Sequence, residues 1–253
     1  MSVKPYIPNA FTLLNLFSGC IAVLFAVNSN FVAAAIFMFL GIFFDFFDGL
    51  LARKLNVQSD LGIQLDSLAD MVTSGLVPGV VMFKLIAISI DAPQVASQND
   101  WSTNFSFSDL RLEPLALIGL FITLASAYRL AKFNIDEDQQ SYFKGLPTPA
   151  NALLIVSLPL IIEFQNNAFV TNLILNKWFL IIVTLFSCYI LNSKIKLLAL
   201  KFKNYKFNEN GYRYSLLVIA LVLLGLFNFI AIPLIILCYI ALSILKQVIT
   251  KTI

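Results

Sequence analysis

Histidine is absent from the 253-residue sequence, and charged residues are scarce. Without histidine the chain lacks the commonest general base and metal ligand, so acid–base chemistry must come from other side chains, above all carboxylates. Charged residues make up 12% of the chain, against about 25% in a soluble globular domain, while 59% of the residues are hydrophobic. This composition excludes an ordinary soluble protein and indicates a protein of the membrane.

The few cysteines and the small net charge exclude two further classes. Cys20, Cys188 and Cys238 lie far apart inside apolar runs, where a free thiol behaves as a small hydrophobe. Neither a disulfide framework nor a zinc site is therefore indicated. The net charge is only +3 and the basic residues lie mostly in short loops, so no nucleic-acid partner is expected.

Long apolar stretches fill most of the chain, and they are long enough to cross a hydrocarbon core of about 30 Å as helices. We therefore predict an all-α protein, a polytopic membrane helical bundle of about eight transmembrane helices. The stretches are 10–28, 31–52, 64–89, 114–133, 149–165, 177–193, 214–229 and 231–248.

Excess lysine and arginine in three links predicts the orientation, because such loops stay on the cytoplasmic side. The basic links are 53–63, 129–148 and 194–213, whereas 91–113 is mainly acidic. We expect an integral protein of the cytoplasmic (inner) membrane, with both termini in the cytoplasm.

The basic link is also the one plausible boundary between domains. It separates a six-helix core, 1–193, from a C-terminal transmembrane hairpin, 214–253, which holds almost no polar side chains. The link, 194–213, could attract anionic lipid, but orientation alone would also require its charges, and we favour the second interpretation.

Four aspartates fall within the predicted helices, where ionisable side chains are costly and face the protein interior or water. Residues three, four and seven apart share a helix face, so Asp45 and Asp48 form one stripe, and Asp66 and Asp70 form another on the next helix. Converging carboxylates repel one another unless a cation neutralises them. Oxygen ligands favour hard ions such as Mg²⁺, Mn²⁺ or Ca²⁺, and four aspartates could hold two ions.

Small residues and an arginine share these stripes. Gly49, Ala52 and Gly62 leave space beside the carboxylates for a substrate headgroup, and Arg53 can face a phosphate. One alternative is that the aspartates are helix-end charges in a solvated loop. Another, from a different functional class, is a cation or proton transporter, although transport predicts polar residues through the whole membrane depth.

The full pattern Asp45-x-x-Asp48-Gly49-x-x-Ala52-Arg53, eight residues, then Gly62-x-x-x-Asp66-x-x-x-Asp70 resembles the signature of the CDP-alcohol phosphatidyltransferases. The resemblance implies an integral-membrane enzyme that moves a phosphatidyl group from a CDP-activated lipid to an alcohol and releases CMP. It implies that the four aspartates hold two divalent cations, Mg²⁺ or Mn²⁺, and that Asp70 is also the base. Gly49, Ala52 and Arg53 would lie against the CDP moiety, on the cytoplasmic side.

Three further segments, 7–19, 129–134 and 143–151, are similar to segments of the phosphatidylserine synthases within that family. The resemblance implies CDP-diacylglycerol and L-serine as substrates, with membrane lipids around the enzyme. Glycerol 3-phosphate or inositol phosphate is the alternative acceptor. A homodimer is an expectation at the level of the family.

The same segments supply candidate binding residues. Asn9, Thr12 and Asn15 could donate hydrogen bonds to cytidine or phosphate, or could equally form a helix cap and contacts between helices. Arg129 and Lys132 could neutralise the serine carboxylate or a lipid phosphate, or could simply anchor the helix end.

Overall fold

The computed structural model describes residues 4, 6–91, 113–135, 143–165, 167–197 and 207–251, so most of the acidic segment and residues 198–206 of the basic link lie outside the described residues. Apart from two strands of two residues each, the elements of the described chain are helices, which confirms the all-α class. The elements are α1 (Tyr6–Val27), α2 (Phe31–Leu55), α3 (Asp60–Asp70), the π-helix η1 (Met71–Leu76), α4 (Val77–Ser89), η3 (Ala116–Leu120), α5 (Phe121–Ile135), β1 (Phe143–Lys144), α6 (Thr148–Gln165), α7 (Ala168–Ile174), α8 (Lys177–Asn192), β2 (Lys196–Leu197), α9 (Phe207–Phe227), η4 (Asn228–Ile230) and α10 (Ala231–Lys251).

Six helical segments of the described chain are long and apolar enough to cross a membrane, or seven if α7 and α8, which meet at 61°, count as one broken span. The last segment, Asn210–Gln247, is 38 residues long and contains both of the final predicted spans. The structure divides it into α9 and α10 at η4, and with the α7–α8 pair counted as one span the total is the eight spans predicted. The protein is thus a polytopic integral-membrane bundle. Because α9 begins at Phe207, the end of the predicted basic link is already helical.

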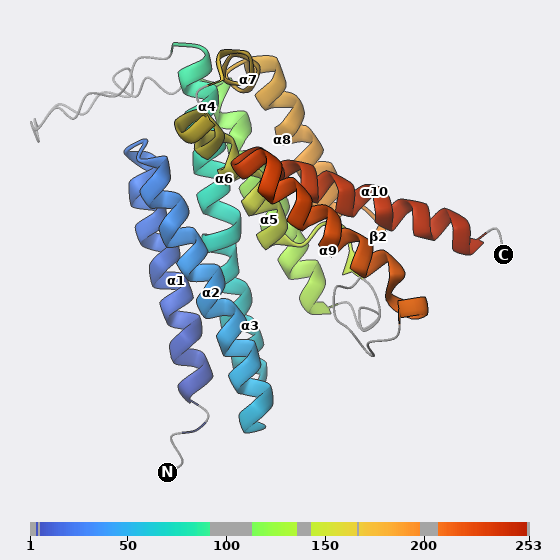
Figure 1. Ribbon diagram of the computed structural model, residues 1–253. Helices are drawn as coiled ribbons and strands as arrows, with labels where there is room; N and C mark the ends of the chain where they lie inside the picture. Colours follow the sequence, from blue (N-terminus) through green and yellow to red (C-terminus); the bar gives the residue numbers. More distant parts are fainter. Residues whose placement is uncertain are drawn as a thin grey trace, which may run out of the picture.

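Helices α1, α2 and the continuous α3–η1–α4 rod run alongside one another on one flank, while α9 and α10 run side by side on the other (Figure 1). Small buried residues dominate the α1–α2 contact, among them Ala22, Ala26, Ala34 and Ala35. Helices in lipid associate through such close backbone packing, because burial from lipid supplies little hydrophobic driving force.

The π-helical turn η1 directly follows Asp70, and turns of this kind are rare and frequent at functional sites. Its backbone approaches α1 and α2 closely, because a Cβ on either Gly19 or Gly41 would collide with Thr73. The Thr73 hydroxyl donates to the carbonyl of Asn15 (3.1 Å), and the Thr123 hydroxyl of α5 donates to the carbonyl of Gly75 (3.1 Å). These contacts fix the rod that carries Asp66 and Asp70 against the rest of the bundle.

A short link sets the relation between α2 and α3. Asn56 ends α2 in the left-handed conformation (φ 55°), and the hydroxyl of Ser59 caps α3 by accepting a hydrogen bond from the Gly62 amide (3.1 Å). Helix α1 packs against both α2 and α3. The three helices therefore bring both predicted aspartate stripes and the polar face of α1 to one place.

Candidate active site

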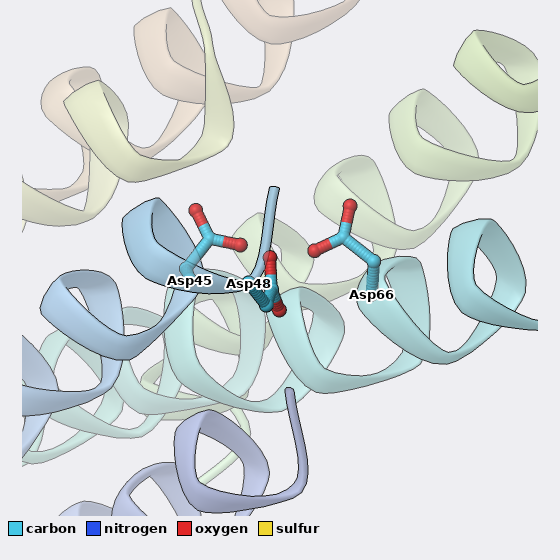
Figure 2. A group of neighbouring side chains, drawn as sticks. All are labelled: Asp45, Asp48 and Asp66. Atoms are coloured by element: carbon cyan, nitrogen blue, oxygen red, sulfur yellow. The ribbon is translucent and has the colours of Figure 1, made fainter. Parts of the chain in front are cut away.

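Three carboxylates gather between α2 and α3, as Figure 2 shows. One oxygen each of Asp45, Asp48 and Asp66 can be chosen so that all three lie within 4.8 Å of one another. Asp48 is only 6% exposed, and the other two are half-buried. The helical spacing therefore predicted correctly that carboxylates from two separate helices converge.

The cluster fits a divalent cation by its own chemistry. Three carboxyl oxygens within 4.8 Å of one another repel when all three groups are ionised, so this closeness requires a proton or a cation among them. Asp66 Oδ1 is buried and has no hydrogen-bond partner among the described residues. An unpartnered oxygen in an all-oxygen donor set is suited to a hard ion such as Mg²⁺ or Mn²⁺.

Asp70 lies beside this trio rather than within it. It follows Asp66 by one helical turn, and its charge interacts with those of Asp45, Asp48 and Asp66. Its Oδ1 accepts a hydrogen bond from the Asn15 side chain (3.3 Å). Asp70 is thus close enough to act together with the other three carboxylates.

Two polar residues of α1 hold the carboxylates directly. The Thr12 hydroxyl donates to Asp48 Oδ2 (2.6 Å), as the Asn15 amide does to Asp70. Of the two roles left open by the sequence, the contact between helices is therefore the one observed for both residues. Thr12 also lines the adjacent cavity, whereas Asn15 does not.

Replacing Thr12 with valine should lower the free energy of unfolding by about 1–2 kcal/mol, because Asp48 loses a buried hydrogen-bond donor. Thermal unfolding of the detergent-purified variant would measure this. Thr184→Val is the matched control, since the buried Thr184 hydroxyl donates only to the carbonyl of Leu180 in its own helix (2.8 Å). Equal effects of the two substitutions would contradict a special role for Thr12.

A cavity of about 180 Å³ opens beside the carboxylates. Of the seven residues predicted to contact the CDP-lipid, six line it and only Asn15 is elsewhere. A Cβ on Gly49 would come within 3.5 Å of the Arg53 guanidinium, and one on Gly62 within 3.2 Å of the Ser59 hydroxyl, so both glycines leave the cavity open. The lining residues are Pro8, Asn9, Thr12, Asp48, Gly49, Ala52, Arg53, Val57, Gln58, Ser59, Gly62, Ile63 and Asp66.

The sequence did not predict that the link between α2 and α3 would line the larger cavity, which it does chiefly through Gln58 and Ser59. The available signal was the shortness of that link, which requires its residues to lie between the two aspartate stripes.

Arg129 and Lys132 lie at a second, smaller cavity of about 20 Å³, roughly the room for one water molecule. Arg129 is only 8% exposed, and its Nε has no hydrogen-bond partner in the described part of the chain. Its charge interacts with that of Asp70, which links this cavity to the carboxylates. Lys144, Asn192 and Ser193 also line it, and none of these three was predicted to do so.

The fold is that of an integral-membrane protein, and its membrane-spanning helices carry a cluster of carboxylates beside a cavity that an arginine lines. Such a centre suits a divalent cation and a phosphate-bearing ligand. The family model described as CDP-alcohol phosphatidyltransferase matches residues 5–189. The chain therefore belongs to the CDP-alcohol phosphatidyltransferase family, and it is a phosphotransferase.

Curated relatives fall within the same family. The chain is 32% identical over 153 residues to CDP-diacylglycerol--serine O-phosphatidyltransferase of Bacillus subtilis, covering 60% of this chain and 75% of the relative. It is 34% identical over 165 residues to the protein of the same name from Methanocaldococcus jannaschii, covering 65% and 63%. The match to the Saccharomyces cerevisiae protein of that name is 31% over 163 residues, covering 58% and 51%.

Proposed function

We propose that this protein transfers a phosphatidyl group from CDP-diacylglycerol to L-serine, giving phosphatidylserine and CMP. The observation that carries the proposal is the carboxylate cluster beside a cavity that residues of the aspartate signature line. The relatives from Bacillus subtilis, Methanocaldococcus jannaschii and Saccharomyces cerevisiae are each named CDP-diacylglycerol--serine O-phosphatidyltransferase. Membership of a phosphotransferase family favours this reading over a cation or proton transporter.

In this proposal Asp45, Asp48, Asp66 and Asp70 hold two divalent cations, Mg²⁺ or Mn²⁺. When bound, the ions would offset the negative charge of the pyrophosphate and of the departing CMP. The closeness of three of the carboxylates and the unpartnered Asp66 oxygen support this assignment.

The larger cavity receives the CDP moiety. Gly49, Ala52 and Gly62 provide its open floor, and the guanidinium of Arg53 pairs with a phosphate oxygen. Asn9, which also lines the cavity, supplies a polar contact, while Thr12 and Asn15 act through the carboxylates that they hold.

Asp70 is the base in this scheme, and its position supports that role. Its charge interacts with Asp66 on the side of the larger cavity and with Arg129 on the side of the smaller one. The serine hydroxyl oxygen attacks the phosphorus that bears the diacylglycerol, its proton passes to Asp70, and the bond from that phosphorus to CMP breaks. Direct displacement is favoured because no serine, cysteine or histidine stands out as a covalent nucleophile.

The acceptor binds beside the smaller cavity, which by itself has room for only about one water molecule. The buried Arg129 guanidinium, with an unpartnered Nε, pairs with the serine carboxylate, and the exposed Lys132 adds positive charge at the entrance. Formation of the cavity by both residues favours acceptor binding over simple anchoring of the helix end.

The active site faces the cytoplasm of a cell whose inner membrane holds the protein, and both termini are cytoplasmic. Basic residues in the last turns of α2 and α5, Arg53, Lys54 and Lys132, support this orientation, because short basic loops remain on the cytoplasmic side. A homodimer stays a prediction.

The acceptor is tested by incubating the purified protein with CDP-diacylglycerol and a mixture of serine, glycerol 3-phosphate and inositol phosphate. We expect phosphatidylserine as the main lipid product, identified by mass spectrometry, together with an equal amount of CMP. If another alcohol gives lipid product and serine does not, the assignment of serine is wrong.

A further inference from the structure

We infer that Asn134 of α5 is a positioning residue that sets the acceptor side of the site relative to the carboxylates. It does so by clamping the end of α5 to α3, the helix that carries Asp66 and Asp70. The inference rests on the proposed function, in which Arg129 of α5 binds the acceptor. It concerns a residue that lines neither cavity and lies outside the aspartate signature.

The clamp consists of two hydrogen bonds that use both ends of one amide group. The Ser67 hydroxyl donates to Asn134 Oδ1 (3.1 Å), and Asn134 Nδ2 donates to Gln64 Oε1 (3.4 Å). The bond from Ser67 is partly buried whereas the bond to Gln64 is exposed, so Ser67 provides the stronger half. Gln64 and Ser67 flank Asp66 within one turn of α3, so the clamp holds the turn that carries this carboxylate.

The clamp secures the part of α5 that its other hydrogen bonds to neighbouring helices leave unsupported. In the described part of the chain two such bonds precede Arg129. The Thr123 hydroxyl donates to a carbonyl of η1 (3.1 Å), and Asn192 Nδ2 of α8 donates to the Ala125 carbonyl (3.0 Å). Asn134 follows Arg129 by five residues, next to the last residue of the helix. The turn that carries Arg129 is therefore anchored on both sides, and Asn134 supplies the anchor after it.

The position of Arg129 depends on its helix. Its side chain is only 8% exposed, and its Nε has no hydrogen-bond partner among the described residues. With no bond at Nε to fix it, the guanidinium is placed chiefly by the backbone of α5. Asp70 is instead tied to α1 by the Asn15 side chain (3.3 Å). A movement of α5 away from α3 would therefore change the separation between the acceptor anchor and the base.

This arrangement predicts a selective effect on the acceptor. The residues that line the larger cavity come from α1, α2, α3 and the link between α2 and α3, and none comes from α5. Helix α1 packs against both α2 and α3, which keeps that cavity in place when α5 moves. Because a misplacement of about 1 Å is costly for a reaction between two bound groups, loosening α5 should weaken the use of the acceptor and spare the CDP-lipid.

The test is Asn134→Ala in the detergent-purified protein. We expect the KM for serine to rise about 5-fold, the usual size of effect for losing a partly buried hydrogen bond, with the KM for CDP-diacylglycerol unchanged. Asn28→Ala is the matched control, because the exposed Asn28 side chain donates to the Leu24 carbonyl at the end of α1 (2.8 Å) and lines neither cavity. An unchanged serine KM, or an equal rise for both substrates, would overturn the inference.

The partner residue supplies a second test. Ser67→Ala removes the donor and should raise the serine KM by a similar factor, whereas Ser67→Thr keeps the hydroxyl and should restore a KM near that of the wild type. In the double variant with Asn134→Ala, Ser67→Ala should add little, because the bond between the two residues is already lost. A full additional effect, or equal rises in Ser67→Ala and Ser67→Thr, would contradict the clamp.

General destabilisation is separated from positioning by temperature. If Asn134→Ala lowers the unfolding temperature, both KM values are measured again at a temperature where the variant is fully folded. A rise confined to serine would support the inference there too, and equal values for variant and wild type would overturn it.

The result is also distinguishable from a failure of the proposed function. If the wild-type protein uses a different alcohol, serine is the wrong acceptor, and the same comparison is made with the KM for the alcohol that it does use. A selective rise of that KM in Asn134→Ala would support the inference, and no rise would overturn it.

Discussion

Replacing Asp70 with asparagine should slow CMP release by a factor of about 100 to 10,000 while leaving the protein folded. Asparagine has nearly the same shape, and its carbonyl oxygen can still accept the hydrogen bond that Asn15 donates to Asp70. What it lacks is the capacity to take a proton from the acceptor hydroxyl, together with one negative charge beside the cation cluster. The loss should therefore fall on turnover far more than on folding.

CMP release over time, in detergent with CDP-diacylglycerol and serine, measures the effect, and size-exclusion chromatography reports the fold. Asp60→Asn is the matched control, because Asp60 is an exposed aspartate at the start of the same helix and lines neither cavity. Its rate should stay near that of the wild type. A folded Asp70→Asn protein with full turnover would rule out Asp70 as the base.

Helical spacing was sufficient to predict much of the site. The interval of three between Asp45 and Asp48, and of four from Gly62 to Asp66, fixes which side chains share a face regardless of how the helices pack. The apolar stretches likewise predicted the bundle, because their length is dictated by the membrane. Both inferences rest on local periodicity, which a sequence displays directly.

Contacts between helices could not be read in the same way. Nothing in the spacing of Thr12 and Asn15 distinguishes a donor to substrate from a donor to Asp48 or Asp70, because the choice depends on how closely α1 approaches its neighbours. That approach is set by Gly19 and Gly41, which admit Thr73 of the π-helical turn. A π-turn has no composition signal of its own, so the position of Asp70 relative to the trio emerged only from packing.

The contacts of the C-terminal hairpin likewise could not be predicted from the sequence. Its sequence is so uniformly apolar that lipid contact alone would explain it. Only the structure shows that Ile236, Tyr239 and Ile240 of α10 form a buried cluster with Leu146 and Leu197, beside the strand pair. Long-range partners of this kind are invisible to periodicity, because they are determined by how separate elements are layered.

Removal of divalent cations should abolish turnover, and Asp66→Asn should reduce it by at least about 100-fold by weakening cation binding. Asp66 contributes the unpartnered oxygen and belongs to the cluster with Asp45 and Asp48, so the amide removes both a ligand and a charge. Electron paramagnetic resonance with Mn²⁺ measures binding apart from activity. We expect tight Mn²⁺ binding by the wild type, with fewer or weaker sites in Asp66→Asn.

Chelation supplies the complementary experiment, with Asp60→Asn again as the control. Turnover should disappear with EDTA and return when Mg²⁺ or Mn²⁺ is added in excess, and Asp66→Asn should need a higher cation concentration for half its maximal rate. The buried and half-buried carboxylates of the cluster would otherwise repel one another, so a cation both permits their approach and completes the site. Full turnover after chelation would show that the reaction proceeds without a cation at this position. Unchanged Mn²⁺ binding in Asp66→Asn would show that Asp66 is not one of its ligands.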